Sequence, residues 1–123
     1  LRRLDNDSKV PYRPDAATVE WIQKIINSLP PDVQRPSLNN LTLYKPGSSS
    51  DNPFGFSGQF AVRELLIMTP GLEQELKKPQ NEISAANLEQ IAINEGMITM
   101  LQDGVLRAIS GDTSLEEVIR VLA

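Results

Sequence analysis

The sequence contains neither cysteine nor histidine among its 123 residues. Without cysteine the chain can form no disulfide and no zinc–thiolate site, a composition that fits a cytosolic protein. The lack of histidine removes the usual nucleophile–base pairs and nearly all conventional transition-metal sites. No apolar run approaches the roughly 20 residues that a membrane-spanning helix needs. We therefore expect a soluble protein with no direct membrane insertion.

Two features of nucleotide-binding and nucleic-acid-binding proteins are also missing. The phosphate-cradling pattern Gly-x-x-x-x-Gly-Lys-Ser/Thr does not occur, and no glycine is followed by lysine anywhere in the chain. The 12 basic residues are scattered and outnumbered by 16 acidic ones, which gives a net charge of −4 that repels nucleic acid. We expect this chain alone to be no enzyme, with no catalytic residue, no cofactor and no nucleic-acid partner.

The remaining composition is typical of one small globular domain. The mass is 13.6 kDa, hydrophobic residues make up 40% and charged residues 23% of the chain. The first residue is Leu1 rather than a methionine, so we expect a fragment of a longer protein. The patterns below predict a mainly α (α+β) fold of about five helices with a short two-stranded antiparallel ribbon. A loop-rich region, 1–66, and a helical region, 67–123, are expected to form one structural domain.

The first half predicts one helix and the ribbon. Asp15 can cap a helix that stops at Pro30 and Pro31 and has apolar residues at helical spacing, namely Val19, Ile22, Ile25, Ile26 and Leu29. Residues 41–45 and 59–68 are rich in β-branched and aromatic side chains and flank the Gly-, Ser- and Pro-rich loop 46–58. We expect these two segments to pair with each other.

The second half predicts four helices. One begins at the cap Thr69 and Pro70 and ends before Pro79, and the next is capped by Ser84 and ends near Gly96. The following helix ends at 110–111 and has inner positions four apart, namely Met97, Leu101, Val105 and Ile109. In the last helix Thr113 and Glu116 form a capping box, and the apolar face comprises Leu115, Val118, Ile119 and Leu122.

The stretch NEGMITMLQDGVLRAISGDTSLEEVIRVL carries a specific motif. It resembles the C-terminal end of the secretion ATPases that drive type II secretion and type IV pilus assembly. That family commonly ends with Gly-Met-x-Thr-Leu, Asp-Gly and Gly-x-Thr-Ser/Thr-Leu-Glu-Glu-Val. The matching residues, with methionine in place of the first leucine, are Gly96, Met97, Thr99, Met100, Asp103, Gly104, Gly111, Thr113, Ser114, Leu115, Glu116, Glu117 and Val118.

The resemblance extends upstream to the zinc clip of the same family, which has two Cys-x-x-Cys pairs. The frame around the pairs is present as Pro11-Tyr12-Arg13-Pro14, Tyr44, Gly47, Gly55-Phe56-Ser57-Gly58 and Glu64-Leu65, with Gln59 where the family has arginine. The four cysteine positions hold Asp5, Ser8, Ser48 and Asp51. These could form an oxygen-ligand site for a hard cation, but serine hydroxyls are weak ligands, and we expect solvated loops without metal.

Several side chains have a structural and a functional interpretation. The aromatic side chains of Phe54, Phe56 and Phe60 have two interpretations. They either anchor a loop to the domain or form an exposed patch to which a partner docks. We expect apolar contacts from the aromatic side chains to close the clip in place of zinc, namely those of Tyr12, Tyr44, Phe54 and Phe56. The helix dipole and the first-turn cap account for Glu116 and Glu117, so neither is expected to be a general acid.

The resemblance implies the C-terminal domain of a cytoplasmic hexameric ATPase that powers type IV pilus assembly or type II secretion. The parent would bind ATP and Mg²⁺ elsewhere, and this domain would have a structural and force-transmitting role. Its implied partners are the nucleotide-binding domain of the same or an adjacent subunit and an inner-membrane platform protein, which would hold it peripherally at the membrane. The alternative is a free-standing helical adaptor that binds a partner through the loop from Phe54 to Phe60.

Overall fold

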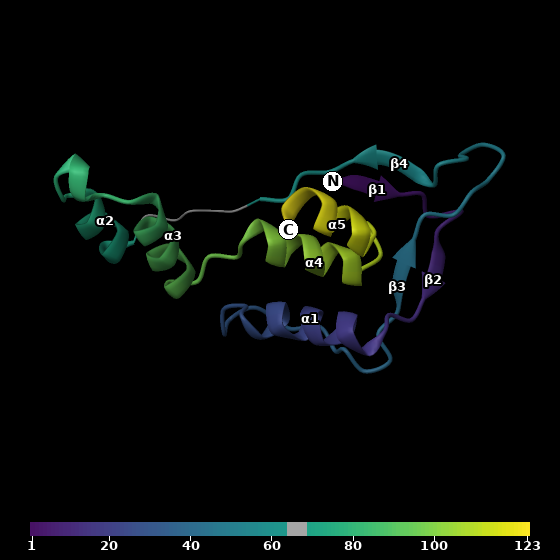
Figure 1. Ribbon diagram of the computed structural model, residues 1–123, viewed down its shortest axis with the longest axis horizontal. Coiled ribbons are helices and arrows are strands. Elements are labelled where there is room, and N and C mark those ends of the chain that lie inside the picture. Colours follow the sequence, from purple (N-terminus) through teal and green to yellow (C-terminus); the bar gives the residue numbers. More distant parts are fainter. Residues whose placement is uncertain (64–68) are drawn as a thin grey trace.

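A computed structural model describes residues 1–63 and 69–123. Within these ranges it has five α-helices, four short strands and one 3₁₀ turn, which confirms the mainly helical α+β class (Figure 1). The helices are α1 (Ala16–Asn27), α2 (Pro70–Leu76), α3 (Ala85–Asn94), α4 (Met100–Ile109) and α5 (Leu115–Leu122). The strands are β1 (Arg2–Leu4), β2 (Val10–Tyr12), β3 (Leu43–Lys45) and β4 (Phe56–Gln59), and the 3₁₀ turn is Gln80–Glu82. No helix in the described ranges is long and apolar enough to cross a lipid bilayer.

The strand pairing differs from the expected ribbon. β3 pairs antiparallel with β2, and β4 pairs antiparallel with β1, so the prediction that 41–45 pairs with 59–68 is wrong for the described part. Segments 2–12 and 43–59 therefore run antiparallel as a ribbon made of two separate two-stranded sheets, β1–β4 and β2–β3, with two loops between the sheets (Figure 1). The end of the predicted second strand and the Glu64-Leu65 match lie outside the described residues.

The hydrophobic core lies between α1, α4, α5 and β3. Buried residues from all four elements meet there, among them Ile22, Ile26, Leu43, Val105, Ala108, Leu115 and Val118. α4 and α5 pack closely at Gly104, where a Cβ atom would lie 2.8 Å from Leu122 Cδ1 and 3.1 Å from Val118 Cγ1. Only glycine leaves room for that approach without moving the α5 side chains.

Helices α2 and α3 form a pair that projects from one end of the molecule, away from α1 and α5 (Figure 1). Thr69 caps α2 by accepting a hydrogen bond from the Leu72 amide, and Ser84 caps α3 by accepting one from the Asn87 amide. Both caps were predicted from the sequence and are confirmed, as is the cap of α1 by Asp15.

Two predicted helix starts are wrong. α4 begins at Met100 rather than at Met97, because Thr99 and Gln102 form a capping box that sets its start. α5 is capped by Ser114, whose hydroxyl accepts from the Glu117 amide, so Thr113 and Glu116 do not form the expected box. Thr113 is fully buried instead, and its hydroxyl donates to the Arg2 carbonyl oxygen at 2.8 Å.

Candidate functional site

The two loops that interrupt the ribbon lie directly against each other. The Asp5 amide donates to the Gly55 carbonyl oxygen at 2.9 Å. A Cβ atom on Gly47 would collide with the carbonyl oxygen of Ser8, so glycine is needed there for the backbones to approach. Tertiary structure thus brings together the loops of the expected clip, 5–9 and 46–55.

The four positions that correspond to cysteines divide into two kinds. The Ser8 hydroxyl donates to Asp5 Oδ2 at 2.7 Å, and both residues are partly buried. Ser48 and Asp51 are exposed to solvent. Within residues 1–63 and 69–123 no three acidic side chains are grouped so that they could hold a metal ion. The metal-free clip stays a prediction that a direct metal analysis must test.

Cation–π contacts and hydrogen bonds connect the loops to the rest of the domain. The Arg2 guanidinium lies 4.1 Å from the Phe56 ring centre, and the Lys9 ammonium lies 4.6 Å from that of Tyr44. Lys9 also donates to the Gly111 carbonyl oxygen at 3.1 Å, which ties the clip to the turn between α4 and α5. The prediction that Phe54 helps to close the clip is wrong, because this residue is 81% exposed. The roles of Arg2 and Lys9 were missed, since the sequence does not show which ring lies beneath a cation.

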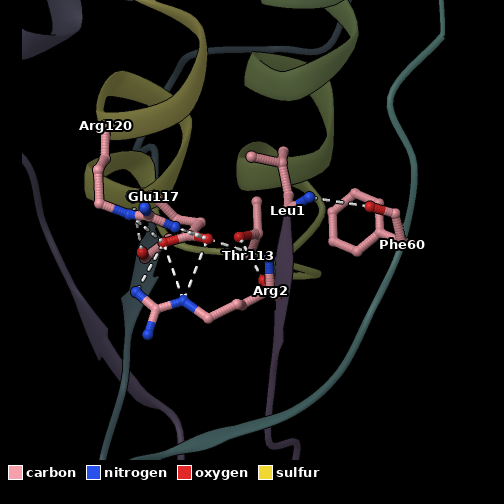
Figure 2. A network of polar contacts seen from close by, with 7 residues as sticks. Leu1, Arg2, Phe60, Thr113, Glu117 and Arg120 are labelled. Carbon is pink, nitrogen blue, oxygen red and sulfur yellow. Dashed lines mark hydrogen bonds and ion pairs between the residues drawn. The ribbon is translucent and has the colours of Figure 1, made fainter.

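A buried ion-pair network joins β1 to α5 (Figure 2). The Glu117 side chain is only 2% exposed and accepts hydrogen bonds from Arg2 Nη2 at 2.8 Å and from Arg120 Nη2 at 2.7 Å. It also accepts one from the Arg2 backbone amide at 3.1 Å. Next to it, the buried hydroxyl of Thr113 donates to the Arg2 carbonyl oxygen, and the Leu1 nitrogen donates to the Phe60 carbonyl oxygen.

Electrostatics fix the protonation state of this network. The hydrogen bonds from Arg2, and after them those from Arg120, hold the pKa of Glu117 well below its usual range, although burial acts in the opposite direction. Glu117 therefore stays ionised at neutral pH and cannot serve as a general acid. The arrangement is suited to holding the first strand against the last helix, and sequence reasoning missed it because it had assigned Glu117 to the helix dipole.

The residues of the C-terminal motif are spread over several places rather than gathered at one site. Gly104, Thr113 and Leu115 lie inside the packing of α4, α5 and the first strand. Gly111 lies in the turn between α4 and α5 with a positive φ of 86°. Glu116 is exposed on α5. Three further motif residues, Gly96, Met97 and Asp103, line a pocket of about 600 Å³ together with Phe60, Ala61, Arg63, Ile98 and Arg107.

Arg107 in that pocket already has several partners. Its guanidinium lies 3.3 Å from Asp112 and 4.0 Å from Asp103, and 5.6 Å from the Phe60 ring centre. Both carboxylates thus already have a cationic partner within the chain. Nothing in this arrangement resembles a nucleophile held by a base, and we assign it to the connection between α4 and Phe60, the residue that follows β4.

A second hollow lies on the outer side of α1 and α5. It has a volume of about 380 Å³ and is lined by Asp15, Ala17, Thr18, Trp21, Leu115, Ile119 and Ala123. Ile119 is 44% exposed, so it does not complete the buried face of α5 as predicted, and Val121 is 48% exposed. Exposed apolar side chains around an apolar hollow are typical of a surface that contacts another protein or domain.

Comparison with known proteins gives consistent relatives. The chain is 31% identical over 122 residues to type II secretion system protein E of Xanthomonas campestris. The matched region covers 98% of the chain and 19% of that protein. It is 34% identical over 119 residues to the type IV pilus assembly ATPase PilB of Myxococcus xanthus, covering 96% of the chain and 19% of the relative. The PilB ATPase of Thermus thermophilus is 28% identical over 97% of the chain and 12% of the relative. No family model matches the sequence.

Proposed function

This chain is a domain of the family that includes type II secretion system protein E and the type IV pilus assembly ATPase PilB, and from that premise we propose a structural and force-transmitting role within a longer ATPase. The observation that carries the proposal is the coverage. Nearly the whole chain matches, yet it spans only about an eighth to a fifth of the length of these relatives. We propose that the chemistry of the parent resides in the remaining four fifths or more.

We place this domain at the C-terminal end of a cytoplasmic hexameric parent that powers pilus assembly or protein secretion. ATP and Mg²⁺ would bind to another domain, because this chain has no Gly-x-x-x-x-Gly-Lys-Ser/Thr segment for phosphates. Its partners would be the nucleotide-binding domain of the same or a neighbouring subunit and the inner-membrane platform protein.

The Glu117 network supports the transmitting role. A movement that enters at the first strand reaches α5 through the Arg2–Glu117 pair and reaches the α4–α5 turn through Lys9 and Gly111. Short polar contacts that are also buried resist displacement better than exposed ones, because water does not compete for them. The first strand and the last two helices would consequently move as one body.

The apolar hollow beside Trp21 and Ile119 is the proposed contact face toward the nucleotide-binding domain. Its lining residues come from α1 and α5 and from one cap of each helix, so a domain seated there would touch two of the three helices around the core. The large share of the relatives that lies outside this chain leaves room for an occupant of that kind in a longer parent.

Extending the reading frame upstream of the Leu1 codon provides the first test. We expect a phosphate-binding motif upstream, ATP hydrolysis by the longer product, and none by the 123-residue chain. In the longer product Ile119→Glu should lower ATP turnover by disrupting the domain contact, whereas Val10→Glu, at an equally exposed apolar site on the ribbon, should not. A start codon next to Leu1 with no such motif upstream would refute the proposal.

One observation favours a second candidate, a free-standing adaptor. Phe54, in the loop 46–55, is 81% exposed, which is unusual for a large aromatic residue. An adaptor would lose partner binding on Phe54→Ser while its melting temperature stayed the same. The outcome of the reading-frame test separates the two candidates before any partner is sought.

A further inference from the structure

A pocket between α2 and α3 contains an unsatisfied buried charge. Its volume is about 380 Å³, and its lining residues are Gly71, Gln74, Glu75, Lys78, Ile91, Asn94 and Glu95. Gly71, Gln74 and Glu75 belong to α2, Ile91 and Asn94 belong to α3, and Lys78 and Glu95 follow these helices, so the described lining comes from the projecting helix pair. Neither the clip nor the Glu117 network includes any of these residues.

Glu75 is the residue that calls for an explanation. Its side chain is only 7% exposed, and one carboxylate oxygen, Oε2, lies 2.7 Å from the ammonium of Lys78. The other oxygen, Oε1, is buried and has no hydrogen-bond donor in the described parts of the chain. A buried carboxylate oxygen without a donor is costly, and native proteins nearly always satisfy such atoms. The pocket thus lacks a donor at the position of Glu75 Oε1.

A second carboxylate lines the same pocket. Glu95 accepts a hydrogen bond from the Thr69 hydroxyl through Oε2, which leaves Oε1 on the side of Gly71. A Cβ atom at position 71 would collide with that oxygen, so the glycine leaves space for it. Among the described lining residues the only cation is Lys78, which is 49% exposed and therefore partly hydrated. Two carboxylates against one half-exposed ammonium leave the pocket with a negative balance.

The wider surroundings strengthen this balance. Residues 69–98 contain five glutamates and two lysines, although the whole chain has a net charge of only −4. The excess negative charge is thus concentrated on the projecting helix pair. A local excess of one sign raises the concentration of oppositely charged ligands and speeds their association.

We propose that this pocket binds the arginine side chain of a partner polypeptide. A guanidinium is planar, always charged and presents several donors in a fixed fork, and in the proposed complex these donors would serve both Glu75 Oε1 and Glu95. Its aliphatic stem would lie against Ile91, the apolar residue of the lining. A metal ion fits less well, because no three acidic side chains are grouped in the described ranges. The inference does not depend on the proposed function.

Titration of the 123-residue protein with Nα-acetyl-arginine amide, followed by ¹⁵N–¹H correlation spectra, tests the proposal. We expect saturable shifts of the amides of Gly71, Ile91 and Asn94. Nα-acetyl-citrulline amide, which has nearly the same shape without the charge, should give none of them. Glu75→Gln and Glu95→Gln should each weaken the arginine complex about tenfold, since a charge-assisted bond is lost in both. Glu89→Gln, an equal change at an exposed site on α3 outside the lining, serves as the matched control.

Four results would overturn the proposal. The first two are that the arginine probe gives no saturable shifts, or that the citrulline probe gives the same shifts as the arginine probe. The other two are that Glu89→Gln weakens arginine binding as much as the pocket variants do, or that Glu75→Gln and Glu95→Gln bind the arginine probe as tightly as the wild type. Should Glu75→Gln lose the dispersed spectrum of the folded protein, Glu95→Gln decides, because the Glu95 side chain is exposed and its replacement leaves the packing intact. A Ca²⁺ titration is run in parallel, and saturable Ca²⁺ binding without an arginine response would assign a cation site instead.

Discussion

Replacement of Glu117 by glutamine should destabilise the domain by about 2 kcal/mol at neutral pH. Removal of one partner from a buried ion pair typically costs about 3 to 5 kcal/mol, because the other charge is left without compensation. Here the two arginines are 44% and 60% exposed, so water can hydrate them once the carboxylate is lost, and the cost falls below that range. The Arg2 amide also loses a charged acceptor at 3.1 Å, which keeps the cost well above zero.

The effect should depend on pH in a defined direction. The pKa of Glu117 is lowered in the folded state from a usual value of 4.5, chiefly by the hydrogen bonds from Arg2. A carboxylate with a depressed folded-state pKa contributes stability that is fully present above the unfolded pKa and is lost as the pH falls toward the folded one. The difference between the wild type and Glu117→Gln should therefore be constant above about pH 5.5 and shrink below 4.5.

Urea unfolding followed by circular dichroism, at several pH values between 3 and 8, measures both effects. Glu116→Gln is the matched control, since the neighbouring residue undergoes the same change of charge and shape but is exposed on the same helix turn. It should cost under about 0.5 kcal/mol, through the helix dipole alone. Equal losses in the two variants, or a Glu117→Gln loss that is unchanged at pH 3.5, would refute the role assigned to the network.

Three further predictions concern the last helix and the clip. Ser114→Ala removes the observed cap of α5 and should cost about 1 kcal/mol in denaturant melts. Leu115→Ala should lower the free energy of unfolding by roughly 2 to 5 kcal/mol, because the residue is only 5% exposed. Ile119→Ala should lower it by under about 1 kcal/mol, because Ile119 is 44% exposed. Equal losses of stability in the two variants would mean that α5 is not packed as described. The melting temperature should be unchanged by a chelator and by added zinc, and elemental analysis that found a stoichiometric metal would show that Asp5 and its neighbours still form a site.

Local signals carried most of the helical part of the fold. A helix cap and its donor lie three residues apart, as for Asp15 and Thr18 or Ser84 and Asn87, so the sequence displays both partners together. The apolar spacing of α1 is visible in the same way. Such elements can be read from the sequence because the interactions that start and stop them are made within one or two turns.

The clip could be predicted only in outline. Its two loops were expected to face each other because the resemblance supplied their frame, and the structure places them in contact at Gly47 and Gly55. Which aromatic rings hold them could not be derived, since exposure depends on the position of distant cations. Phe56 is covered by Arg2, whereas Phe54, two residues earlier, projects into solvent.

The choice between Thr113 and Ser114 separates what the sequence determined from what tertiary structure decided. Both are hydroxyl residues followed three positions later by a glutamate, so the sequence by itself determined that a capped helix begins here but offered two equivalent starts. The first strand decided between them. The Arg2 carbonyl oxygen accepts a hydrogen bond from the Thr113 hydroxyl, and the Arg2 guanidinium forms an ion pair with Glu117. Arg2 lies 111 residues from Thr113 and 115 residues from Glu117 in the sequence. Strand pairing and buried ion pairs depend on such distant contacts, and no local pattern of residues records them.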